Sequence, residues 1–273
     1  MKVDAALTGV SETALLTLQV RAQEARRPDA IIDDPMAVQL VDGIEFDFAK
    51  FGHTRRQDMA VRALAFDRAT RRYLIDHPAA TVVALAEGLQ TSFHRVDASG
   101  VGHQFLWLTV DLPPVAKLRE KLLPASDRVT VCAQSALDFG WMDGVDTDHG
   151  VFVTAEGLLM YLEPSDAMGL ISECARRFPG GKMMFDLQPS WFAMLARRGG
   201  LRTSLRYRVP PMPFSLSAAE AAELVDVVHG IRAVHDVPYP PGRGRLLNTT
   251  MWAAQRIPLL DPVRPLLTLL EFG

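Results

Sequence analysis

Short apolar runs alternate with helix-like segments through the middle of this 273-residue chain, and this alternation is the strongest constraint on its fold. Each run is almost continuously apolar, which is typical of parallel strands buried on both faces of a sheet. The runs lie at 81–86, 104–110, 128–133, 150–155 and 182–186. The segments between them, mainly 113–123 and 165–178, are expected to be helices. The pattern predicts an α/β fold with a mostly parallel sheet and helices on both faces.

The segments before this core are helical in pattern. Apolar residues recur at helical spacing in 13–26, and a second, shorter helix is expected to start at Asp33-Asp34-Pro35, where proline suits the first helical position. A longer helix is expected at 55–76. We therefore expect an N-terminal helical cap over residues 1–78 and a sheet domain over residues 79–273, the two forming one structural unit.

The C-terminal part of the chain has a weaker pattern. A helix is expected at 217–228, and two further strands at 230–237 and 248–254 would complete a seven-stranded sheet. The arginine- and proline-rich region near 188–216 is either a lid over a ligand or an ordinary exposed loop.

Composition excludes several classes of function. The net charge of −3 argues against a nucleic-acid surface, and no apolar run is long enough to span a membrane. The start of the chain, Met1-Lys2-Val3-Asp4, lacks the features of a signal peptide, so a cytoplasmic location is expected. Cys132 and Cys174 are expected to be small buried hydrophobes. The sequence contains no phosphate-loop, HExxH, CxxC or GxSxG motif, which disfavours nucleotide triphosphatases, metal catalysis and α/β-hydrolases.

Acidic residues follow three of the predicted strands, where an open α/β sheet binds its ligands. Asp111 ends the second strand and either accepts hydrogen bonds from a ribose diol or caps the helix that starts near Pro113. Glu156 follows the fourth strand. The first strand leads through Glu87 into a turn with one glycine, Gly88, which an ordinary strand-to-helix turn explains equally well.

Several stretches together resemble the leucine carboxyl methyltransferase superfamily. They are 13–18, Arg21-Ala22, Asp33-Asp34-Pro35, Arg62 with Asp67, 88–91, Phe93-His94-Arg95, 110–113 and 155–162. Within it, segments 44–49 and 177–181 are most similar to tetracenomycin-type polyketide O-methyltransferases. The resemblance implies a class I methyltransferase (Rossmann-like) sheet and S-adenosylmethionine as cofactor.

The resemblance also assigns cofactor contacts. The residues concerned are Arg62, Ala86, Gly88, Asp111, Ser135, Ala136 and Glu156. It implies that Arg62 pairs with the methionine carboxylate, as a planar guanidinium can, that Gly88 lies under the methionine, and that Asp111 binds the ribose.

The same resemblance places Ser135 and Ala136 at the adenine. It places Glu156 beside the methionine amino group and the acceptor. It leaves the catalytic residue unassigned.

This chain departs from the family pattern in its first turn. The family usually reads Leu-Gly-x-Gly-Leu-Asp-Thr-Arg, whereas here Ala86 replaces the first glycine, Gln90 the aspartate and Ser92 the arginine. Ser135 stands where an aspartate is common. These losses predict weaker cofactor binding, of the order of tenfold for a single charge-assisted hydrogen bond.

The leading hypothesis is methyl transfer from S-adenosylmethionine to an oxygen of a small, aromatic or polyketide-like acceptor. A phenol needs a base, for which Tyr161 and His94 are candidates, whereas a carboxylate needs none. The alternative is a degenerate methyltransferase-fold protein that binds cofactor or ligand without methyl transfer. Protein carboxyl methylation is a third possibility.

Overall fold

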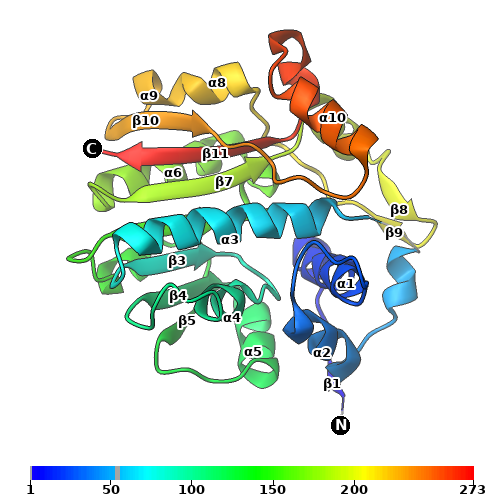
Figure 1. Cartoon of the computed structure of the whole chain (residues 1–273). Coiled ribbons are helices and arrows are strands. Elements are labelled where there is room, and N and C mark those ends of the chain that lie inside the picture. The colour runs from blue at the N-terminus through cyan, green and yellow to red at the C-terminus, as the bar shows by residue number, and fades with distance from the viewer. Residues whose placement is uncertain (1, 53–55) are drawn as a thin grey trace.

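A seven-stranded sheet runs through the centre of the molecule, in the order β10-β11-β7-β6-β3-β4-β5 (Figure 1). The computed structural model describes residues 2–52 and 56–273. The strands are β3 (Thr81–Leu85), β4 (Leu106–Asp111), β5 (Val129–Ala133), β6 (Val151–Ala155), β7 (Lys182–Leu187), β10 (Ile231–Asp236) and β11 (Leu266–Phe272). All pair in parallel except β11, which is antiparallel to both of its neighbours. The predicted α/β architecture is therefore confirmed, and the five strands of the core lie where the apolar runs predicted them.

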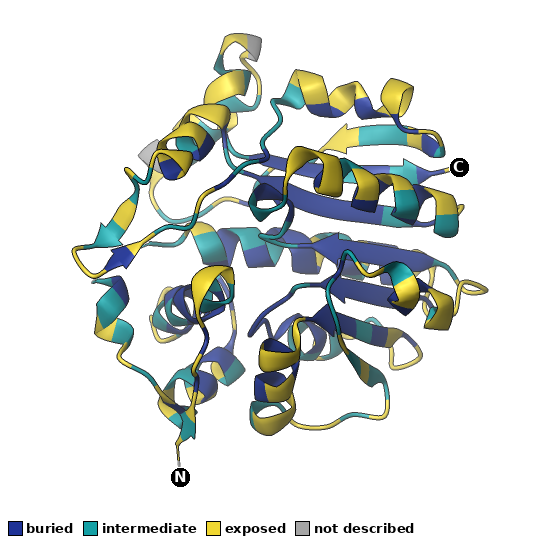
Figure 2. Ribbon diagram, turned by 180° about the vertical axis from the view of Figure 1, so that it is seen from behind, coloured by how far each residue is buried: buried dark blue, intermediate teal, exposed yellow. Residues whose placement is uncertain are grey.

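Each face of the sheet packs on a helix because successive strand residues point to opposite sides. Val82 of β3 belongs to the core that includes Phe66 of α3 (Asp58–Asp76), whereas the next residue, Val83, packs with Leu170 of α6 (Pro164–Arg177). Figure 1 shows α3 in front of the sheet. The view from behind shows the outward face of α6 exposed above buried strands (Figure 2).

The N-terminal cap consists of α1 (Thr13–Ala25), α2 (Pro35–Gly43) and the start of α3. The Asp34 side chain caps α2 by accepting a hydrogen bond from the Ala37 N–H at 3.0 Å. The predicted start of the third helix at residue 55 lies outside the described residues. The core of the cap includes Leu89 and Leu118 of the sheet domain. The two parts thus share one apolar core.

The C-terminal region differs from the prediction. Residues 248–254, predicted as a strand, belong to the helix α10 (Arg245–Ala254). The strand that completes the sheet is β11, which is inserted between β7 and β10 and is mostly buried. A position inside the sheet needs a segment that is apolar on both faces, and β11 meets this requirement better than the polar run Asn248-Thr249-Thr250.

The remaining elements are short. They are β1 (Val3–Asp4), β2 (Ile44–Glu45), α4 (Ser92–Asp97), α5 (Pro113–Leu122), α7 (Ser190–Arg197), β8 (Arg202–Ser204), β9 (Tyr207–Arg208), α8 (Ala218–Ala222) and α9 (Leu224–Val227). The predicted helix at 217–228 is thus two short helices, and Ser217 opens the first with a capping box to Glu220.

The two cysteines are both free thiols, but only Cys174 is buried as predicted, because Cys132 lies half-buried on the edge strand β5. In the part of the chain that the structure describes, no helix has the length and apolarity needed to cross a bilayer.

Candidate functional site

A cavity of about 1000 Å³ lies where the carboxyl ends of β3, β4 and β6 meet the cap and the C-terminal region. All seven residues predicted to bind the cofactor contribute to its wall. They are Arg62, Ala86, Gly88, Asp111, Ser135, Ala136 and Glu156. Parallel strands bring their carboxyl ends to one edge of the sheet, which explains why residues so far apart in the chain converge.

The turn after β3 has an unusual backbone. Ala86 adopts a φ of 48°, and its N–H donates to the Val110 carbonyl at 2.7 Å. A left-handed conformation costs a residue with a Cβ about 1–2 kcal/mol. Gly88 has a φ of +60°, and a Cβ there would lie 2.8 Å from the Cβ of Ala14 in α1. Glycine is therefore required at position 88 by both conformation and space, whereas Ala86 holds a strained conformation.

Asp111 holds this turn in place. Its Oδ2 accepts the Gly88 N–H and its Oδ1 accepts the Leu112 N–H, each at 2.8 Å. Burial raises the pKa of Asp111 to about 6, although these hydrogen bonds oppose the shift. Asp111 does not cap α5, whose first residue is Pro113 and which has Leu112 as its N-cap. Each carboxylate oxygen has a further lone pair available to a ligand.

Arg62 and Glu156 form an ion pair at the opposite wall. The Nε of Arg62 donates to Glu156 Oε1 at 3.0 Å, and its Nη1 donates to Asp186 Oδ2 at the same distance. Asp186 also accepts the Gly157 N–H at 2.6 Å. Burial raises the pKa of Glu156, with Arg62 acting in the opposite direction, whereas Asp186 and Glu156 together raise the pKa of Arg62.

Asp186 was missed by the sequence analysis as a site residue. It is fully buried, and its position as an acid at the end of the predicted strand 182–186 was the available signal. A Cβ at Gly157 would lie 3.2 Å from the terminal nitrogens of Arg62, so the glycine lets the backbone pass under the guanidinium.

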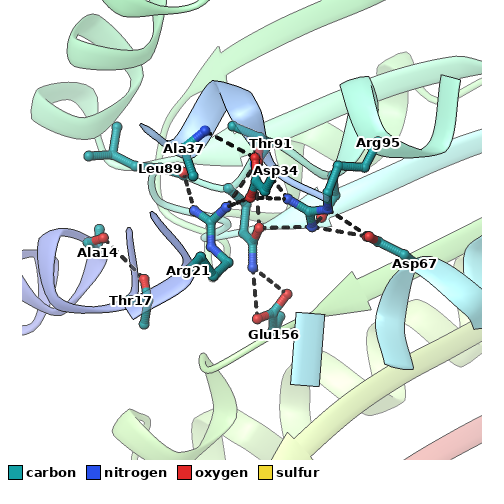
Figure 3. A network of polar contacts seen from close by, with 12 residues as sticks. Ala14, Thr17, Arg21, Asp34, Ala37, Asp67, Leu89, Thr91, Arg95 and Glu156 are labelled. Atoms are coloured by element: carbon teal, nitrogen blue, oxygen red, sulfur yellow. Dashed lines mark hydrogen bonds and ion pairs between the residues drawn. The ribbon is translucent and has the colours of Figure 1, made fainter. Parts of the chain in front are cut away.

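Gln90 is the second residue whose role the sequence did not predict. Its Nε2 lies 2.8 Å from both carboxylate oxygens of Glu156, and its Oε1 accepts from Arg95 Nη2 at 3.2 Å. Glu156 and Arg95, the two residues that the Gln90 side chain contacts, are both labelled in Figure 3. Gln90 therefore bonds to the strand-end acid directly.

Ser135 and Ala136 lie in the turn that follows β5. Ser135 Oγ accepts the Leu137 N–H at 3.2 Å, and the Ala136 carbonyl accepts from Trp141 Nε1 at 3.1 Å. These bonds keep the turn at the cavity wall, close to the end of the strand that neighbours β4.

The other part of the cavity is lined mainly by apolar and aromatic side chains. They include Leu158, Met160, Phe192, Val209, Met212 and three tyrosines, Tyr161, Tyr207 and Tyr239. Burial raises the pKa of Tyr161 to about 12, so its hydroxyl is neutral at neutral pH. His94 is half-buried with a lowered pKa, and it is not among the described residues that line the cavity. Of the two predicted bases, only Tyr161 therefore reaches this site.

Comparison with known proteins is consistent with this geometry. The sequence profile described as leucine carboxyl methyltransferase matches residues 14–175. The chain is 36% identical over 194 residues to the tetracenomycin polyketide synthesis O-methyltransferase TcmP of Streptomyces glaucescens, covering 70% of each chain. It is 30% identical over 200 residues to the S-adenosyl-L-methionine-dependent methyltransferase dpfgK of Gibberella zeae, covering 66% of each.

Solved structures are similar at the level of the fold. A DUF574 family protein from Streptomyces avermitilis aligns with a TM-score of 0.56 at 16% identity, covering 79% of this chain and 84% of the other. The CurJ carbon methyltransferase aligns with a TM-score of 0.54 at 12% identity, covering 96% and 68%. At these identities the likeness concerns the fold alone.

Proposed function

This chain belongs to the leucine carboxyl methyltransferase family, and from that membership we propose that it methylates an oxygen of a small aromatic or polyketide-like acceptor. It is a methyltransferase that depends on S-adenosylmethionine. The observation that carries the proposal is the division of one cavity into a polar wall of strand-end acids and a wall of apolar and aromatic side chains.

The polar wall fits the cofactor. The free lone pairs of Asp111 suit the two hydroxyls of a ribose, and Ser135 and Ala136 lie beyond it for the adenine. The Glu156 carboxylate stands at the cavity wall, where it favours a bound ammonium and sulfonium. When bound, the cofactor supplies an electrophilic methyl group.

Arg62 has one donor group left for a ligand. Its Nε and Nη1 are engaged by carboxylates, whereas Nη2 has no hydrogen-bond partner among the described residues. We infer that this nitrogen meets the carboxylate of the cofactor, as the family resemblance suggests.

The apolar wall fits a flat, mostly carbon acceptor. Phe192, Tyr207, Val209 and Met212 come from the segment 188–216, which also packs on the cap through an Arg206–Asp47 ion pair at 2.8 Å. Ser204 Oγ donates to the Lys50 carbonyl in the same contact. We infer that this segment covers the acceptor and excludes water, which supports alignment of the oxygen with the methyl group.

The acceptor oxygen is inferred to enter as an anion. Tyr161, with a pKa of about 12, is too weak an acid to be present as a phenolate base at neutral pH. Among the described residues, three arginines line the cavity, and two of them, Arg56 and Arg62, are ion-paired. Arg256 stacks on Trp252 at 4.3 Å and has no ion-pair partner among the described residues. It is therefore available to a carboxylate or an acidic phenol.

The test is methyl transfer from isotopically labelled S-adenosylmethionine to a panel of aromatic carboxylic acids, acidic phenols, neutral phenols and a peptide with a free carboxyl end. We expect product from the acids and the acidic phenols, detected by mass spectrometry. Transfer to the peptide alone contradicts the small-molecule proposal. Cofactor binding by calorimetry without transfer to any member supports the degenerate alternative.

A further inference from the structure

The closest polar contact of Glu156 outside its ion pair is a side-chain amide. Gln90 Nε2 lies 2.8 Å from Oε1 and 2.8 Å from Oε2, so the amide bridges the whole carboxylate. Gln90 is 6% exposed and the Glu156 side chain 7%, which leaves little room for water to replace this bond. Loss of this donor would leave the buried Glu156 carboxylate with Arg62 as its one remaining hydrogen-bond partner among the described residues, which costs free energy.

The contact with Arg95 determines the orientation of the Gln90 side-chain amide. Arg95 donates to Gln90 Oε1 at 3.2 Å, and arginine has no acceptor group, so the carbonyl oxygen faces Arg95 and the NH₂ group faces Glu156. The backbone N–H of Thr91 lies 3.4 Å from the same oxygen. A flipped amide would present donors to a donor and an acceptor to a carboxylate.

Arg95 is itself held by two acids of the cap. Its Nε and Nη2 donate to Asp67 at 2.7 and 3.0 Å, and its Nη1 donates to Asp34 at 2.8 Å. Asp34 is completely buried and also pairs with Arg21, which is completely buried too. Figure 3 shows these side chains converging from α1, α3, α4 and the start of α2. Asp34 and Arg95 each have several side-chain partners, and both oxygens of Asp67 accept from Arg95, so the orientation of Arg95 is fixed from two sides.

We propose that Gln90 is a positioning residue that transmits the fixed geometry of the Arg95–Asp34–Asp67 cluster to the Glu156 carboxylate. The inference rests on the proposed function, in which Glu156 faces the cofactor. It also gives a structural reason for the glutamine that this chain has at position 90, where the family usually has an aspartate. A carboxylate at position 90 would lie against Glu156, and two buried carboxylates in contact cannot both stay ionised. Glutamine supplies a donor where an acid would be repelled.

Charged side chains from several helices and a strand surround Glu156. Arg62 of α3 donates to Glu156 and also to Asp186 of β7, and Arg21 of α1 and Arg95 of α4 add positive charge nearby. None of these changes in a Gln90 variant. A new pH dependence in such a variant is therefore attributable to position 90.

The first test uses the protein without cofactor. In Gln90→Glu, carboxyl-carbon NMR of glutamate-labelled protein is expected to reveal a group that titrates in the neutral range. The matched control is Gln104→Glu, the same chemical change at an exposed position. The pH midpoint of this titration should be lower in the double variant Gln90→Glu with Glu156→Gln. A Gln90→Glu protein with no such titration overturns the proposal.

The second test measures binding of S-adenosylhomocysteine by calorimetry. We expect Gln90→Glu to bind about tenfold more weakly than the unaltered protein near pH 8, and we expect this difference to close near pH 6, where the pair shares a proton, each comparison being made at one pH. Gln90→Met is expected to bind weakly at both pH values. If Gln90→Glu does not fold, the result for Gln90→Met decides the test. Binding by Gln90→Met equal to that of the unaltered protein overturns the proposal. Failure of the unaltered protein to bind counts against the proposed function instead, and the cofactor-free titration then still decides the role of Gln90.

Discussion

Arg62 and Glu156 are 94 positions apart in the sequence, yet Arg62 Nε donates to Glu156 Oε1 at 3.0 Å. The contact joins α3, which starts in the cap, to the residue that follows β6. Its side chains are 12% and 7% exposed, so the pair is largely shielded from water. The cap is therefore part of the site.

Replacing Arg62 by methionine should be severely damaging. The change leaves Glu156 and the fully buried Asp186 without a shared cation, which typically costs about 3–5 kcal/mol of folding free energy. Arg68→Met, at an exposed position of the same helix, is the control and should change the unfolding midpoint little. Urea unfolding measures both. Equal midpoints for the two variants would contradict the structural role of the pair.

Ala86→Gly should stabilise the protein. Glycine adopts the observed φ of 48° without the Cβ clash, and the gain is partly offset by the greater freedom of glycine in the unfolded chain. We expect a net gain of about 0.5–1 kcal/mol. Ala98→Gly, at an exposed position with a φ of −67°, should have the opposite sign. Loss of stability in both variants would show that the turn is not strained.

Gly88→Ala should displace the turn after β3. The new Cβ would meet the Ala14 Cβ at 2.8 Å in addition to the cost of a positive φ. We expect a loss of about 1–3 kcal/mol together with weaker cofactor binding. The double variant Gly88→Ala with Ala14→Gly should recover only the steric part. Complete recovery in thermal unfolding would mean that the backbone conformation contributes nothing.

Cofactor binding should weaken as pH falls through about 6. Asp111 has a pKa raised by burial to about 6, and its protonation removes an acceptor from the ribose site. The same shift means that the folded state binds more protons than the unfolded state between about pH 4 and 6, so the contribution of Asp111 to stability falls as pH rises through that range. Calorimetric titration with S-adenosylhomocysteine across this range measures the first effect. In Asp111→Asn, both pH dependences should flatten.

Much of the fold was predictable because the decisive signals are local. The burial of β3, β4, β6 and β7 follows from their apolar composition, whereas β5 is only partly buried because it lies at the edge of the sheet. The closing strand was misplaced because the segment 248–254, which begins with three polar residues, and the apolar run 266–272 compete for one place in the sheet. That competition is decided by the gap between β7 and β10, which is a tertiary property.

The site residues likewise divide into those that the sequence identified and those that it missed. Asp111 and Glu156 were identifiable because a strand end defines where its acid points, whereas Gly88 was assigned through the family resemblance and its positive φ is a finding of the structure. The role of Gln90 was not identifiable, because its partners lie far away in sequence, and Asp186 was missed although it too ends a predicted strand.

The sequence by itself determined the layered α/β architecture, the family and the strand-end acids, since burial pattern and turn chemistry act over a few residues. Only the tertiary structure decided that Gln90 bonds Glu156, that Arg95 orients Gln90, and that the cap supplies the acids behind them. Buried charges and amides are stable only when every donor finds an acceptor, and that matching exists only once the chain has folded.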